Sequence, residues 1–174
     1  MASPENDWER SWYLARLRGI GPEMTTFLWR LLHKLLPTQD RVYKIVKTKT
    51  SSPICQLCQE NSVEDLHHAF FSCSFNSNAG SLLTRSLTSL ITRVTDKKIL
   101  LLDIDIEPED EFPAVWLISH FLHYIWSSRV EKRKVKLYAV RADLEARASL
   151  LRETRYQISF NRLQELLQIC FNRL

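Results

Sequence analysis

Four residues in one short segment have the types and spacing of metal ligands. Cys55, Cys58, His68 and Cys73 form the pattern C-x2-C-x9-H-x4-C. Three thiolates and one imidazole complete a tetrahedral ligand set for Zn²⁺ and leave no coordination position for water or a substrate. The pattern therefore predicts a structural zinc site, and it favours a binding or scaffolding domain over a catalyst.

The use of cysteine also favours metal binding over disulfides. Three of the four cysteines lie close together beside histidines, without a secretory context, which indicates thiols in a reducing compartment. A redox C-x2-C pair is disfavoured because the βαβ pattern typical of such motifs is missing. We expect Cys170 to be a buried, inert thiol. His67 and His68 are adjacent, and we select His68 for its spacing to Cys73 while keeping His67 as the alternative ligand.

The elements that must position these ligands are predicted to be helices. Only 3 glycines and 6 prolines occur in 174 residues, which argues against a loop-rich or all-β fold. Pro37 ends an apolar helix, and Thr38 is a suitable N-cap for the next. The fold class is therefore mainly α, with a small CCHC zinc knuckle inserted and one short extended segment. The expected helices are 7–46 with breaks at 19–22 and 37, 81–94, 113–126, 135–156 and 161–174, and the expected extended segment is 99–106.

This pattern divides the chain into three parts. Residues 1–49 form an N-terminal helical segment, residues 50–76 the zinc-binding unit, and residues 77–174 a C-terminal helical region. We expect the first and third parts to pack together as one domain. The apolar helix 113–126 is expected to be buried.

Several of these segments together resemble a known family. Trp29-Arg-Leu-Leu-His-Lys-Leu-Leu-Pro-Thr-Gln-Asp-Arg41, the Cys55-Gln-Leu-Cys58 pair and Glu64-Asp-Leu-His-His-Ala-Phe-Phe-Ser-Cys73 are similar to the zinc-binding domain near the C-terminus of non-LTR (LINE-type) retrotransposon reverse transcriptases. The strong part of this resemblance covers residues 25–75. A later segment, 140–152, is similar to the helical tail of some of these polyproteins.

The resemblance implies a domain that follows the polymerase and helps it engage template RNA or target DNA. It implies Zn²⁺ as the cofactor and Cys55, Cys58, His68 and Cys73 as its ligands. No catalytic residue carries over, because the polymerase Tyr/Phe-Ala-Asp-Asp motif and an endonuclease half are both missing from these residues. We therefore expect a non-enzymatic fragment or remnant of a reverse transcriptase polyprotein, with RNA or single-stranded DNA and a polymerase domain as partners.

Two basic stretches are candidate phosphate contacts. The net charge of +4 permits nucleic-acid binding without demanding it, and ordinary solvated faces are the alternative. If the helices pack side by side, the two stretches form one surface. The first stretch contains Arg41, Lys44, Lys47 and Lys49, and the second contains Arg129, Lys132, Arg133, Lys134 and Lys136.

Two other functions compete with nucleic-acid binding. In the first, the chain is a protein-interaction scaffold, and the seam of Leu137, Val140, Leu144, Ala148 and Leu151 pairs with another chain together with the terminal helix. In the second, Asp103, Asp105 and the acidic residues 107–111 hold Mg²⁺ for a nuclease, although an acidic loop before a helix N-terminus accounts for them equally well.

Other features narrow the expected partners and location. No apolar run reaches the roughly 18–20 residues of a membrane span, and nothing indicates a small-molecule substrate. We expect an intracellular protein of the nucleus or cytoplasm that is not secreted. The tryptophans, Trp8, Trp12, Trp29, Trp116 and Trp126, are expected to be packing residues and not platforms for nucleobases. His33, His120 and His123 are expected to be core or boundary residues.

Overall fold

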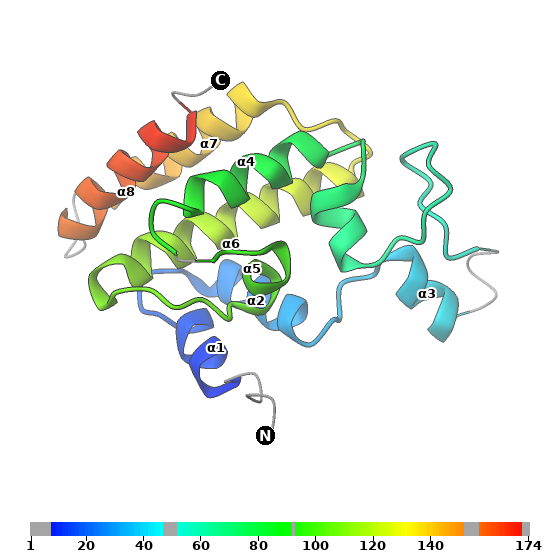
Figure 1. Ribbon diagram of the computed structural model, residues 1–174, viewed down its shortest axis with the longest axis horizontal. Helices are drawn as coiled ribbons and strands as arrows, with labels where there is room; N and C mark the ends of the chain where they lie inside the picture. Colours follow the sequence, from blue (N-terminus) through cyan, green and yellow to red (C-terminus); the bar gives the residue numbers. More distant parts are fainter. Residues whose placement is uncertain (1–7, 47–51, 92, 152–156, 172–174) are drawn as a thin grey trace.

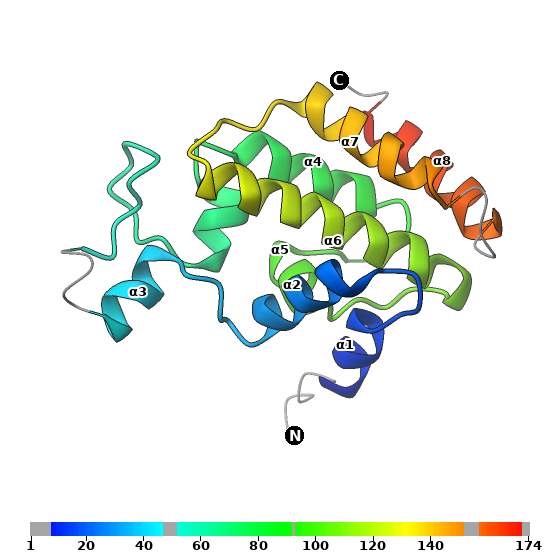
Figure 2. The ribbon, with the colours of Figure 1, turned by 180° about the vertical axis from the view of Figure 1, so that it is seen from behind.

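Helix α6 (Pro108–Val130) runs through the centre of the molecule, and the other helices pack around it (Figures 1 and 2). The structure, a computed structural model, describes residues 8–46, 52–91, 93–151 and 157–171. Both views show α4, α7 and α8 along one side of α6 and the N-terminal helices along the other. The remaining bounds are α1 Trp8–Ala15, α2 Pro22–Leu32, α3 Gln39–Ile45, η1 His68–Ser72, α4 Ser77–Leu87, α5 Asp96–Leu101, α7 Leu137–Ser149 and α8 Gln157–Phe171.

The apolar residues of α6 explain its central place. They surround the helix on nearly every side, and the segment from Pro113 to Leu122 is buried throughout. Such a helix is stable only inside the protein. It begins at Pro108 and not at Pro113 as predicted, because Pro108 occupies the first turn with Glu107 as the N-cap residue. The acidic residues 109–111 in that first turn also suit the positive end of the helix dipole.

Two carboxylates in the first turn of α6, Asp110 and Glu111, pair with basic side chains from α8 and α1. Asp110 accepts two hydrogen bonds from Arg162 of α8, at 2.6 and 3.2 Å. Glu111 pairs with Arg10 of α1 at 2.6 Å and accepts a hydrogen bond from Tyr13. These carboxylates therefore tie α1 and α8 to α6, and among the described residues they form no cluster suited to a metal ion.

The prediction of an extended segment over 99–106 is wrong for residues 99–101, which belong to α5. Thr95 caps α5 by accepting a hydrogen bond from the Lys98 backbone N–H, and Asp96 follows in the first turn. Ile99 and Leu100 are buried, but they lie in a helix and not in an extended segment. The helix ends at Leu102, which has a left-handed backbone (φ 50°). A short apolar run cannot distinguish a strand from a buried helical turn, and here the N-cap decides the outcome.

The apolar seam of α7 is used within the chain. Val140, Leu144 and Ala148 are fully buried, and α7 packs against both α8 and α6. The seam is therefore not a free surface for another chain, as the scaffold interpretation required. The boundaries also differ from those predicted, since α7 spans Leu137–Ser149 and α4 spans Ser77–Leu87.

The mainly α fold class is confirmed. Within the described residues the only β pairing is the isolated bridge between Ile54 and Val63, and a Cys₃His group lies in the inserted unit. α6 is the longest described helix, and neither it nor any other described helix has the continuous apolar length needed to span a bilayer. Thr38 caps α3 as predicted, accepting a hydrogen bond from the Arg41 backbone N–H.

Gly80 allows α4 to approach the segment that carries two of the candidate ligands. A Cβ atom at residue 80 would clash with the carbonyl oxygen of Phe70 and would lie 2.9 Å from Cα of Phe71. Both neighbours are backbone atoms of η1, so neither can move away cheaply. The close contact between α4 and η1 therefore requires glycine.

Replacing Gly80 by alanine is expected to destabilise the protein by about 1–3 kcal/mol, the usual cost of overpacking. Helix propensity alone predicts the opposite sign, because alanine is favoured over glycine by roughly 1 kcal/mol inside a helix. Urea unfolding of the Gly80→Ala variant measures the difference, with Ser81→Ala, at an exposed neighbouring position, as the matched control. An equally stable or more stable Gly80→Ala variant would contradict the close approach.

Candidate metal centre

The first two candidate ligands lie in a narrow hairpin. The backbone N–H of Cys55 donates to the Ser62 carbonyl, and Ile54 forms the antiparallel bridge with Val63. Asn61 adopts the left-handed conformation (φ 50°), which asparagine tolerates better than most residues. The backbone N–H of Leu57 points at Sγ of Cys55 at 3.5 Å. The turn thus places both cysteines on one side and directs a backbone donor at the first sulfur.

The other two candidate ligands mark the ends of a single π-helical turn. The backbone N–H of Cys73 donates to the carbonyl of His68 at 2.9 Å, a hydrogen bond across five residues. In an α-helix, the side chains of residues five apart point in directions about 140° apart around the helix axis. A π-turn brings the two directions closer together. Asp65 caps the helical segment that begins at Leu66 and leads into this turn, by accepting a hydrogen bond from the His68 N–H at 2.7 Å. The H-x4-C spacing therefore matches the local backbone, which turns extended at Cys73.

The four ligand atoms converge on one point. Sγ of Cys55 and Sγ of Cys73 are 3.9 Å apart, Sγ of Cys58 and Nε2 of His68 are 3.4 Å apart, and all four atoms lie within 4.8 Å of one another. Around Zn²⁺, with Zn–S bonds of about 2.3 Å, the edge between two sulfurs of a regular tetrahedron is roughly 3.8 Å. The donor set and its dimensions therefore fit a structural zinc ion.

The structure places His68, and not His67, in this group. His68 is buried, with Nε2 toward Cys58 and Nδ1 3.5 Å from the Ser72 hydroxyl. His67 is exposed and lies 3.3 Å from Asp96 of α5. Neighbouring residues on a helical turn point in different directions, so only one of the two histidines can reach the cysteines.

A buried arginine from the far end of α6 completes the surroundings of the cluster. Nη2 of Arg129 lies 2.8 Å from Oε2 of Glu64 and 3.5 Å from Sγ of Cys55. Both side chains of this ion pair are over 90% buried. Nη1 of Arg129 is also buried, and the described residues offer it no hydrogen-bond partner. Glu64 in turn accepts a hydrogen bond from the Gln39 N–H, so the pair connects α3, the zinc unit and α6.

The electrostatics of the site suit a bound cation and its thiolates. Desolvation raises the pKa of the metal-free Cys58 thiol to about 12, so metal binding must displace a proton. Burial, followed by the charge of Arg129, lowers the pKa of His68 and favours the neutral imidazole that binds metals. Burial by itself would lower the pKa of Arg129, but the nearby sulfurs of Cys73 and Cys55 together with the charge of Glu64 outweigh it and raise that pKa. Arg129 is therefore a permanent positive charge beside the sulfurs.

Arg129 is consequently misplaced among the predicted phosphate contacts. Only 5% of the residue is exposed, so a nucleic acid cannot reach its guanidinium. The sequence signal for its actual role was weak, because Arg129 and Glu64 are separated by much of the chain. Glu64 begins one of the segments that carry the family resemblance, but nothing in the sequence indicates that it is buried.

The other predicted basic residues are exposed or half-buried where the structure describes them. Arg41 and Lys44 lie on α3, whereas Lys132, Arg133, Lys134 and Lys136 follow the end of α6. In Figures 1 and 2, α3 and the end of α6 lie at the same end of the molecule, and the hairpin of the zinc unit projects beyond them. Gln39 at the start of α3 and Lys132 line one cavity together with Gln56 and Leu57 of the zinc unit, so both stretches lie next to that unit. Lys47 and Lys49 lie outside the described residues.

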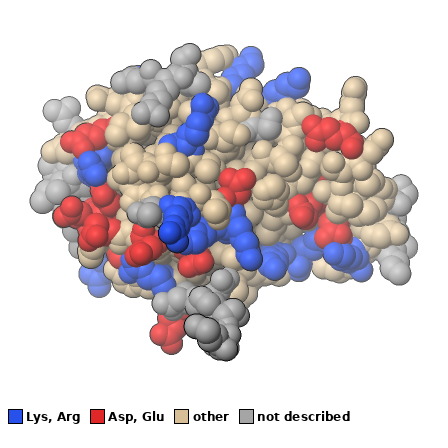
Figure 3. Space-filling view, viewed as in Figure 1, with Lys and Arg blue, Asp and Glu red and all other residues tan. Residues whose placement is uncertain are grey.

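A cleft of about 590 Å³ lies beside the metal cluster and brings in cations that the sequence did not single out. Lys34 from the end of α2 and Lys97 of α5 line it together with Arg41, Lys44 and His67. Asp40 and Asp65 are its acidic residues. Figure 3 shows Lys and Arg side chains along the lower half of the face that carries α3 and α5, with Asp and Glu among them.

Comparison with known proteins agrees with this geometry. Residues 2–79 match the model of a family described as zinc-binding in reverse transcriptase. The matched segment contains the four clustered residues as well as α1, α2 and α3. No curated protein and no solved structure gives a significant match. Residues 2–79 are therefore similar to a zinc-binding domain of reverse transcriptases, and Arg129 lies well beyond the matched segment.

Replacing His68 by alanine is expected to abolish tight zinc binding, because three ligands do not close a structural site. His67→Ala is the matched control and should bind Zn²⁺ like the unaltered protein, since His67 is directed toward Asp96. Competition with a chromophoric chelator measures both affinities. Loss of binding in the His67 variant with retention in the His68 variant would contradict the arrangement.

Replacing Arg129 by methionine is expected to lower zinc affinity by about 10–100-fold, the usual effect of removing an outer partner of a metal ligand. Zinc with three thiolates and a neutral histidine carries a charge of −1, which Arg129 offsets. Arg129→Lys should retain part of the affinity because it keeps the charge. The double variant Arg129→Met/Glu64→Gln removes the unpaired buried carboxylate, so it should regain stability without regaining zinc affinity. Unchanged affinity in Arg129→Met would contradict this role.

Proposed function

We propose that this chain is the zinc-stabilised, nucleic-acid-binding accessory region of a LINE-type reverse transcriptase, without catalytic activity of its own. RNA or single-stranded DNA is its partner, and a polymerase domain is the enzyme that it serves. The family match supports the reverse transcriptase context. The proposal of nucleic-acid binding depends on the surface beside the metal cluster.

The cationic cleft is the observation that carries the proposal. Its four lysine and arginine side chains outnumber its two carboxylates. One carboxylate, Asp40, already pairs with Lys44 at 2.8 Å. The other, Asp65, accepts the His68 backbone N–H. The cleft therefore has a net positive charge and suits a phosphate backbone, which basic grooves follow without regard to sequence.

Arg41 is well placed for such a contact. Its Nη1 donates to the backbone carbonyl of Lys34 at 2.7 Å, which holds the guanidinium at the edge of the cleft. The guanidinium has five N–H donors in a planar fork that matches phosphate, so one backbone contact leaves others to bind. Lys34 and Arg41 both line the cleft, so they place two positive charges in it between α2 and α3.

The segment after α6 provides a second set of cations next to the zinc unit. Lys132 lines a small cavity together with Gln56 and Leu57 of the knuckle, so the basic segment lies against the metal unit. Arg133 pairs with Glu131 at 2.7 Å, which reduces its contribution. We propose that a strand bound in the cleft extends past the knuckle toward Lys132, Lys134 and Lys136.

The scaffold function has less support. Its apolar seam on α7 is covered by α6 and α8, and α8 packs against α4, α6 and α7. The magnesium nuclease is also disfavoured, because the Cys₃His cluster is the only candidate metal group within the described residues. Binding to nucleic acid remains the function that the exposed charges favour.

Replacing Lys44 and Lys97 together by alanine is expected to weaken binding of a single-stranded RNA oligomer severalfold at low salt. Each lost phosphate contact should reduce the slope of log K against log salt by roughly 0.7. Fluorescence anisotropy over a series of salt concentrations measures both quantities. Arg141→Ala, on the exposed side of α7, is the matched control and should retain the slope. Affinity that does not depend on salt would exclude phosphate binding by this cleft.

A further inference from the structure

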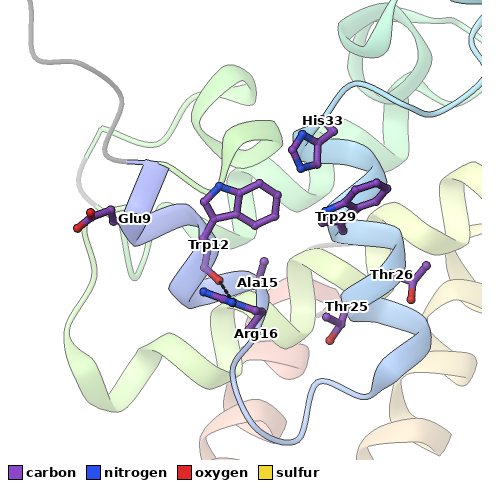
Figure 4. A pocket seen from close by; sticks show the side chains of 8 residues that line it. All are labelled: Glu9, Trp12, Ala15, Arg16, Thr25, Thr26, Trp29 and His33. Atoms are coloured by element: carbon purple, nitrogen blue, oxygen red, sulfur yellow. Dashed lines mark hydrogen bonds between the residues drawn. The ribbon is translucent and has the colours of Figure 1, made fainter.

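A second hollow lies between α1 and α2, and its walls are aromatic. Figure 4 shows the indole rings of Trp12 and Trp29 pointing toward each other from the two helices, with the imidazole of His33 beside both. The His33 ring centroid lies 4.8 Å from that of Trp12 and 4.7 Å from that of Trp29. Trp29 is 46% exposed and Trp8 is 43% exposed, which contradicts the expectation that both are packing residues.

The composition of this groove distinguishes it from a site for an apolar peptide. It has a volume of about 870 Å³, and among the described residues that line it there is no leucine, isoleucine, valine, methionine or phenylalanine. Grooves that bind amphipathic helices are lined by such aliphatic or flexible side chains. Aromatic faces with few aliphatic neighbours suit flat ligands that stack. The described residues of the lining are those labelled in Figure 4.

The groove holds one basic and one acidic side chain, Arg16 and Glu9, and its polar groups do not select a particular base. Arg16 is exposed, and its Nε donates to the Trp12 carbonyl at 3.3 Å, which holds the guanidinium at the rim. The hydroxyls of Thr25 and Thr26 already donate to carbonyls one turn earlier in α2. They are therefore occupied and do not select one base over another. Arg30 is also exposed on α2.

The groove is adjacent to the cationic cleft. His33 lines the groove, and the next residue, Lys34, lines the cleft. Lys34 has a left-handed backbone (φ 54°) at the end of α2, so the two side chains leave the helix in different directions. A strand whose phosphates lie in the cleft can therefore continue across this corner and present its bases to the groove.

We propose that the Trp12–Trp29 groove is a stacking site for unpaired nucleobases of the same strand that the cationic cleft binds. This inference depends on the proposed function and adds selectivity for single strands. Stacking on aromatic side chains accepts any base, because every base has a π-face, and it requires bases that are not paired. Duplex nucleic acid should bind only through its phosphates.

An abasic oligomer tests the groove separately from the cleft. The probes are a 12-nucleotide oligo(dT) and an abasic strand of the same length, which has the same phosphates and no bases. The unaltered protein should bind oligo(dT) roughly fivefold or more tightly than the abasic strand. Trp29→Ala should lose this difference while its affinity for the abasic strand is unchanged, and Trp29→Phe should retain part of it. Tyr138→Ala, an exposed aromatic residue on α7, is the control and should behave like the unaltered protein.

The outcomes separate the two proposals. Equal affinity of the unaltered protein for both strands overturns the stacking site and leaves the cationic cleft intact. A preference for oligo(dT) that survives in Trp29→Ala overturns it as well. No binding of either strand overturns the proposed function together with this inference. If Trp29→Ala instead abolishes binding of an apolar peptide and leaves both strands unaffected, the groove is a protein-docking site. Circular dichroism of each variant verifies that it is folded.

Discussion

The buried ion pair of Arg129 and Glu64 is the contact on which the arrangement of the molecule depends. It joins the end of α6 to the zinc unit, and Glu64 also accepts the Gln39 N–H at the start of α3. A buried pair of this kind stabilises a protein only if its other hydrogen-bonding groups are satisfied. Here the guanidinium also faces the sulfur of Cys55. With a zinc ion bound, the three thiolates would supply the negative charge that the second half of this guanidinium lacks, so the metal and the ion pair would stabilise each other.

This dependence changes where the zinc-binding domain ends. The family match ends at residue 79, yet the charge that balances the cluster comes from α6. Gly80 adds a second constraint, since α4 packs so closely on η1 that no side chain fits between them. The helices after the knuckle therefore belong physically to the metal site. Without the metal, Arg129 and Glu64 stay buried but the guanidinium lacks the charge of the thiolates. Loss of the metal is therefore expected to destabilise the packing of α6 at the centre of the fold.

Local features of the sequence predicted the parts of the structure that local interactions decide. The spacing of the four ligands, the Thr38 cap and the burial of the apolar helix are all present. The spacing to Cys73 correctly predicts His68, and not His67, as the residue near the cysteines. The π-turn that explains this spacing was not predicted. Long-range contacts were beyond prediction. The role of Arg129 depends on a partner far away in the chain, and the exposure of Trp29 depends on how α1 lies against α2.

The metal site and the cationic cleft share one stretch of backbone, which relates the structural zinc to the proposed binding. Asp65 lines the cleft and also caps the helical segment that leads into the π-turn, by accepting the His68 N–H. His67 faces the cleft, while His68, the next residue, faces the cysteines. One wall of the cleft is thus the outer side of the turn whose inner side holds the metal. Because ligands fixed by a metal cannot shift without breaking coordination, zinc binding keeps this wall in position opposite Arg41 and Lys44. A structural ion can in this way hold a nucleic-acid-binding surface of the protein in place without contacting the nucleic acid.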